Sequence, residues 1–186
     1  MSSKPLYLLP FDHRHSYLTG MFGFTPPLTA DQRAAVVDSK QVIYEGFQRA
    51  LGPDLKASSG GILVDEEFGA GILRDAKAKG YITALSTEES GSDEFEFEYG
   101  PKFAEHLATF DPTFAKVLVR YNPESEDRAL NQRQTARLVR LSNACRATDR
   151  KFMFELLVPA TPSQMNRVGG DQAKYDLQVR PELMLR

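Results

Sequence analysis

Five short apolar segments recur along this chain, and helix-like segments separate them. The apolar segments span residues 6–11, 61–65, 81–85, 115–121 and 152–158. Runs of this length, rich in β-branched and aromatic residues, are typical of buried strands. Helical patterns follow Thr29, whose spacing to Gln32 is that of a capping box, and cover about 71–79, 101–106 and 126–147. Such repeated strand and helix units predict a parallel α/β sheet, either open and doubly wound or closed into a barrel.

Charged residues inside two of the predicted strands favour the barrel. In the fourth segment, a period of two places Lys116, Leu118 and Arg120 on one face. In the fifth segment, Glu155 interrupts an otherwise apolar run. An open sheet covered by helices on both faces rarely buries such side chains, whereas a barrel lumen near its mouth can hold paired charges. We therefore predict a fold of the (β/α)8 TIM-barrel type, with these polar faces in the lumen.

The number of predicted units indicates a partial barrel. A full barrel takes about 250 residues, and the 186 residues here accommodate five strand and helix units. We expect a single partial domain over residues 1–186, with roughly three units of the eight missing. Pro181 is well placed in the first turn of a helix, but only five residues follow it.

Composition and charge restrict the function classes. A net charge of -2 and an isoelectric point near 6.0 give no general attraction to nucleic acid or to anionic membranes. The single cysteine, Cys145, excludes an internal disulfide framework and lies on a predicted helical core face. No long apolar run that could serve as a signal peptide or membrane span opens the chain. We expect a cytoplasmic protein that binds a small molecule and forms homo-oligomers if its open sheet edges pair.

Polar residues at the ends of the strands are the candidate site. In parallel α/β folds, ligands bind where strands give way to loops, and Asp12, His13 and Arg14 follow the first strand. His13 could also bind a divalent metal together with Asp65, Glu66 and Glu67, because imidazole and carboxylate groups suit such an ion. A metal-dependent lyase or isomerase is therefore an alternative. Lys40 lies on the apolar stripe of its helix, where we interpret its stem as covering apolar surface rather than as a functional amine.

Four motifs together resemble a known family. They are Leu8-Leu9-Pro10-Phe11-Asp12-His13-Arg14, Val64-Asp65-Glu66-Glu67-Phe68-Gly69, Lys116-Val117-Leu118-Val119-Arg120-Tyr121-Asn122-Pro123-Glu124 and Phe154-Glu155-Leu156-Leu157-Val158-Pro159-Ala160-Thr161-Pro162. Over essentially the whole chain, they resemble the aldolase domain at the carboxyl end of bacterial 5-dehydro-2-deoxygluconokinase fusions. That domain is similar to tagatose 1,6-bisphosphate aldolases, which are class I, Schiff-base enzymes with a (β/α)8 barrel and need no metal or other cofactor.

The resemblance implies a reaction and a set of site residues. The reaction is cleavage of 2-deoxy-5-keto-gluconate 6-phosphate, a step of inositol breakdown, into dihydroxyacetone phosphate and malonate semialdehyde. Such a site needs a lysine that condenses with the ketone and carboxylates that move protons. By similarity, Asp12, Lys116 and Glu155 are catalytic. Asp12 and Glu155 would handle protons or carbinolamine formation, and Lys116 would be a second cation that lowers the pKa of the nucleophile or holds a substrate oxygen. The implied substrate-binding residues are His13, Arg14, Glu66, Arg120 and Asn122.

The Schiff-base lysine of that family lies on the sixth strand, which would follow Arg186, and so does the phosphate pocket of the last strand loops. Three interpretations follow. The chain is part of a longer aldolase, or it is a noncatalytic module that binds ligand or assembles through open edges, or Lys116 itself is the nucleophile of a reduced site. On the first interpretation, these 186 residues alone would not turn over substrate.

Overall fold

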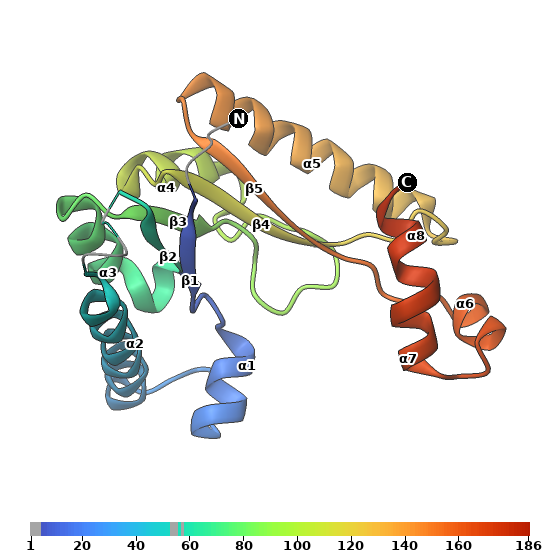
Figure 1. Ribbon diagram of the computed structural model, residues 1–186, viewed down its shortest axis with the longest axis horizontal. Coiled ribbons are helices and arrows are strands. Elements are labelled where there is room, and N and C mark those ends of the chain that lie inside the picture. The colour runs from blue at the N-terminus through green and yellow to red at the C-terminus, as the bar shows by residue number, and fades with distance from the viewer. Residues whose placement is uncertain (1–4, 53–55, 57) are drawn as a thin grey trace.

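The computed structural model describes residues 5–52, 56 and 58–186. Five strands form a single sheet in the order β1-β2-β3-β4-β5, and each neighbouring pair is parallel. The strands are β1 (Tyr7–Pro10), β2 (Gly60–Val64), β3 (Ile82–Ser86), β4 (Phe114–Arg120) and β5 (Lys151–Leu157). All five lie within one residue of the predicted bounds. The sheet curls into a half-barrel (Figure 1), so the predicted partial barrel is confirmed.

Helices alternate with these strands as predicted. They are α1 (His15–Tyr17), η1 (Leu18–Phe22), α2 (Ala30–Ala50), α3 (Glu66–Ala78), η2 (Gly100–Lys102), α4 (Phe103–Phe110) and α5 (Arg128–Ala147). After β5 come α6 (Pro162–Arg167), α7 (Gln172–Lys174), η3 (Tyr175–Val179) and α8 (Arg180–Met184). Figure 1 shows this last group gathered beyond the end of β5. Among the described residues, no helix is long and apolar enough to cross a membrane.

Local sequence explains where these helices begin. The capping box of Thr29 and Gln32 is present at the start of α2. Helix α3 begins at Glu66 rather than near residue 71, because the Asp65 side chain accepts a hydrogen bond from the Phe68 amide and so satisfies the first turn. The predicted short helix from Pro101 to His106 continues to Phe110.

The main core lies between the sheet and its covering helices. Its largest cluster contains Ile62 and Val64 of β2, Val117 and Val119 of β4, and Cys145 of α5, which confirms the predicted place of the cysteine. The acidic segment of residues 88–98 alternates Phe with Glu, a pattern typical of a solvated face or lid or of an edge strand. In the structure, a single bridge between Glu88 and Phe97 forms there instead of a strand. Phe95 and Phe97 enter the main core.

Candidate active site

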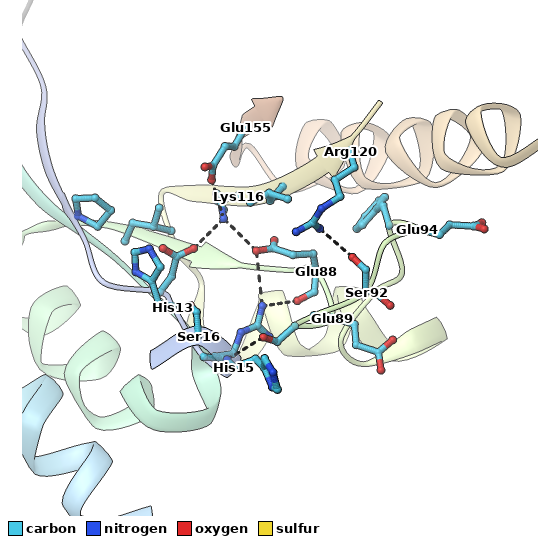
Figure 2. A pocket seen from close by; sticks show the side chains of 18 residues that line it. His13, His15, Ser16, Glu88, Glu89, Ser92, Glu94, Lys116, Arg120 and Glu155 are labelled. Atoms are coloured by element: carbon cyan, nitrogen blue, oxygen red, sulfur yellow. Dashed lines mark hydrogen bonds and ion pairs between the residues drawn. The ribbon is translucent and has the colours of Figure 1, made fainter. Parts of the chain in front are cut away.

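Lys116 stands at the centre of a charged cluster at the carboxyl-terminal ends of the strands. Its Nζ lies 2.8 Å from Asp12 Oδ2, 3.0 Å from Glu88 Oε1 and 3.0 Å from Glu155 Oε2. Figure 2 shows Lys116 between Glu88 and Glu155. The three acids come from the loop after β1, the loop after β3 and strand β5. The Lys116 side chain is 3% exposed. Three carboxyl groups from three elements therefore surround one buried cation.

Strand geometry explains why these groups meet. Lys116 pairs in register with Ser86 of β3 and Met153 of β5. Two residues further along β4, Leu118 pairs with Glu155 of β5. Because alternate residues of a strand share a face, Lys116 and Arg120 both line the concave side. This confirms the predicted lumen face of β4. Glu155 forms an ion pair with Lys116, although the Glu155 side chain is 49% exposed.

Asp12 and Glu88 differ in how well their negative charge is stabilised. Burial opposes ionisation of Asp12, but the Lys116 ammonium outweighs it and holds the pKa of Asp12 below its usual value. The Ser86 hydroxyl also donates a hydrogen bond of 2.7 Å to Asp12. For Glu88, burial prevails over the attraction of Lys116 and raises the pKa. The site therefore pairs a carboxylate with a carboxyl group that retains its proton more readily, the arrangement that acid–base chemistry uses.

Lys116 itself is held in its charged form. Burial alone would lower the pKa of its ammonium, but the acidic groups around it, Glu88 when ionised, Asp12 and the hydrogen-bonded Glu155, more than offset this effect and raise it. A lysine that attacks a ketone must first lose its proton. The surroundings of Lys116 therefore suit an electrophile that binds and polarises a substrate oxygen, and they oppose the nucleophile of a reduced site.

The cluster opens into a cavity of about 430 Å³, which is large enough for a sugar phosphate. Its walls include Asp12, His13, Arg14, Glu88, Lys116, Arg120 and Glu155. Arg14 is 7% exposed, and its guanidinium donates to the Glu98 carboxylate at 2.7 Å and to the Glu88 carbonyl at 2.6 Å. His13 is exposed at the cavity wall. Six predicted site residues, and Glu88 in addition, thus share one cavity.

Arg120 is the cation best placed to meet a ligand. Its guanidinium donates to the Ser92 carbonyl at 3.0 Å (Figure 2). Within the part of the chain that the structure describes, no carboxylate lies within ion-pair distance of it. Arg14 and Lys116 are by contrast both paired with acids. Arg120 therefore retains an uncompensated positive charge in the cavity wall.

Two predicted substrate-binding residues lie outside this cavity. Glu66 contacts His106 Nδ1 at 3.0 Å, and both residues line a separate, smaller pocket. Asn122 is buried, and its amide donates to the Pro159 carbonyl at 2.8 Å and to Gln164 at 2.7 Å. Its contacts tie the end of β4 to α6, so the structure gives Asn122 an architectural place. We keep neither residue among the ligand contacts.

The predicted four-residue metal cluster is not assembled. Across residues 5–52, 56 and 58–186, no three His, Cys, Asp or Glu side chains are grouped to hold a metal ion. Asp65 is paired with Lys40, Glu66 with His106 and Glu67 with Arg33. His13 faces the separate cavity beside Lys116. Each of the four candidate ligands therefore has a different neighbourhood, and the proposed common site was wrong.

Sequence reasoning missed two residues that shape the site. Glu88 lies in an acidic segment whose composition is typical of a solvated loop, yet it follows β3 as Asp12 follows β1, so the same strand-end rule could have identified it. Lys40 was interpreted as a stem that covers apolar surface rather than as a functional amine, and its Nζ is buried. It donates to the Phe11 carbonyl at 2.9 Å and the His13 carbonyl at 3.1 Å, and it pairs with Asp65. Lys40 thus fixes the backbone on both sides of Asp12.

Fold and site together define a barrel-type α/β domain with an acid–base cavity at the carboxyl-terminal ends of its strands. The chain belongs to the family described as "Uncharacterized protein conserved in bacteria (DUF2090)", whose model matches residues 2–184. No curated protein matches the chain.

Proposed function

We propose that this domain is a class I aldolase-like module that acts on a phosphorylated keto sugar acid, of the kind represented by 2-deoxy-5-keto-gluconate 6-phosphate. The observation that carries the proposal is the Lys116 ammonium, shared by Asp12, Glu88 and Glu155 at the wall of one cavity. Aldol cleavage needs a group that stabilises negative charge on oxygen and groups that take up and return protons. The cluster supplies both.

In this proposal each group has a defined task. Lys116 donates a hydrogen bond to the substrate oxygen on which negative charge develops. Asp12, ionised and adjacent, accepts a proton from a substrate hydroxyl, and the half-exposed Glu155 exchanges protons between the cavity and solvent. Arg120 binds an anionic group of the substrate, since a guanidinium suits carboxylate and phosphate geometry.

The nucleophilic lysine is a separate requirement. Among the described residues, the lysine that lines the cavity is Lys116. Its acidic neighbours keep its amine protonated. We therefore assign it to oxygen binding, and formation of an imine would need a neutral lysine brought to the cavity from elsewhere. The residues described here should then bind the keto sugar acid phosphate without cleaving it.

Calorimetric titration with 2-deoxy-5-keto-gluconate 6-phosphate tests this function. We expect measurable binding by the unmodified chain and a loss of about 10- to 100-fold in affinity for Arg120→Met, because hydrogen bonds to charged groups contribute about 1.5–3 kcal/mol. Arg146→Met is the matched control, since Arg146 is exposed on α5 and lies outside the cavity. Absence of binding, or equal losses in the two variants, would contradict the proposal.

A further inference from the structure

The charges around Lys116 do not balance. Four carboxyl groups, those of Asp12, Glu88, Glu98 and Glu155, are connected through two cations, Lys116 and Arg14. If all four acids were ionised, the cluster would carry an excess of negative charge in a largely buried place, which is costly. A proton on one of the acids removes part of this excess.

Exposure and hydrogen bonding indicate which acid holds the proton. Glu155 and Glu98 are 49% and 26% exposed, so water can stabilise their charges. The Asp12 and Glu88 side chains are each 11% exposed. Asp12 Oδ2 accepts from both Ser86 and Lys116. Glu88 Oε2 is buried and has no hydrogen-bond partner among the described residues. Of the four, Glu88 therefore has the least stabilised negative charge.

We propose that Glu88 is a positioning residue that stays protonated at pH values where ordinary glutamates are ionised, and that its neutral carboxyl keeps the Lys116 ammonium available to substrate oxygen. This inference rests on the proposed function and deepens it. A neutral Glu88 still accepts a hydrogen bond from Lys116 through Oε1 and holds the ammonium in place. An ionised Glu88 would add a further full negative charge beside Lys116, and so weaken its attraction for an anionic ligand.

The groups that face Glu88 come from every side of it. They are Lys116 on β4, Asp12 and Arg14 after β1, Glu98 on the same loop, and Glu155 on β5 across the ammonium. Other ionisable side chains, those of His13, His15, Glu89 and Glu94, also line the cavity. A measurement of pH dependence must therefore isolate Glu88. The variant Glu88→Gln does so, because the amide resembles a neutral carboxyl in shape and leaves the other groups in place.

Carbon-13 NMR of side-chain carboxyl groups in the ligand-free chain gives the direct test. An ordinary glutamate has a pKa of about 4.3. We expect the resonance that Glu88→Gln removes to change from that of a protonated carboxyl to that of a carboxylate at a higher pH than the resonances of the exposed glutamates of the same chain. A change at the same pH as those glutamates, or at a lower one, would overturn the proposal. The test needs no ligand, so it remains decisive even if the proposed substrate does not bind.

Ligand affinity provides the second readout. Dihydroxyacetone phosphate is titrated into the unmodified chain and into Glu88→Gln at several pH values, and the ratio of the two affinities cancels the titration of the phosphate itself. We expect a ratio near one at the acid end of the series, where Glu88 holds its proton, and a progressive loss of affinity in the unmodified chain as the pH rises and Glu88 ionises. A ratio that is constant with pH, or a Glu88→Gln variant that no longer folds, would contradict a neutral Glu88. Absence of binding by both chains would count against the proposed function, and NMR would then decide the Glu88 question alone.

Discussion

At the scale of single residues, Lys40 and Asp65 form the junction that holds the site in place. Lys40 extends from α2 to the backbone on either side of Asp12, and Asp65 both binds Lys40 and caps α3. Both side chains are about 1% exposed. Removal of one partner would leave the other charge buried and unpaired, which is far costlier than removal of both.

We predict that Lys40→Met lowers the free energy of unfolding by about 3–5 kcal/mol. The double variant Lys40→Met with Asp65→Asn should recover part of that loss, because the asparagine keeps the helix cap but carries no charge. Urea denaturation of the unmodified chain, Lys40→Met, Asp65→Asn and the double variant measures the coupling. A loss below about 1 kcal/mol for Lys40→Met would show that the buried pair is not needed.

The same residues show how far the sequence determines the site. The family resemblance implied that Asp12, Lys116 and Glu155 belong to one site. Strand ends and the period of two explain why the structure brings them together. Lys40 was placed correctly on the core face of α2, but helical periodicity cannot reveal which polar groups another element brings to that face. Glu88 was missed because its many acidic neighbours made the whole loop look solvated.

At the scale of elements, α3 packs closely on β2 through Gly69. A Cβ atom at Gly69 would lie 2.4 Å from Cγ2 of Val64, far inside van der Waals contact. Gly71, two residues further on, is exposed and has no atom within 4 Å of such a Cβ. The two glycines lowered the apparent helix propensity of this segment, which explains why the helix was predicted to begin too late. Capping by Asp65 overrides that propensity.

These two glycines form a matched pair for mutagenesis. We predict that Gly69→Ala destabilises the fold by about 1–3 kcal/mol through overpacking against Val64. Gly71→Ala should stabilise it by about 0.5–1 kcal/mol, since alanine loses less backbone freedom in a helix. Thermal or urea unfolding of both variants provides the comparison. Equal effects of the two substitutions would show that α3 does not approach β2 as closely as described.

The bounds of the strands were easier to predict than the long-range contacts between elements. The strands were located to within one residue because β-branched and aromatic runs ended at polar or turn residues. The conformation of the loop of residues 87–99 was not predicted, since its alternating Phe and Glu residues suggested an edge strand. In the structure, Arg133 and Arg137 of α5 bind Glu94, and Phe95 and Phe97 turn into the core. Such long-range contacts are absent from any local pattern.

At the scale of the whole molecule, the half-barrel leaves apolar side chains exposed at both edges of the described sheet. Phe152 and Phe154 on β5, and Tyr7 and Leu9 on β1, are each at least 37% exposed. Exposed edge strands favour pairing with another chain. These edges are therefore the feature that supports a noncatalytic assembly module. The charged cavity is the stronger indication of function. Burial of acids and cations costs desolvation free energy, and such groups gather in clefts chiefly at functional sites.

The most direct test of this account is a crystal structure of the protein with 2-deoxy-5-keto-gluconate 6-phosphate. We predict that the ligand occupies the cavity beside β1, β3, β4 and β5, with an oxygen atom within hydrogen-bonding distance of Lys116 Nζ, an anionic group at Arg120 and no covalent bond to Lys116. A ligand bound elsewhere, or a covalent adduct on Lys116, would contradict the assignment of Lys116 as the charged, oxygen-binding centre of the site.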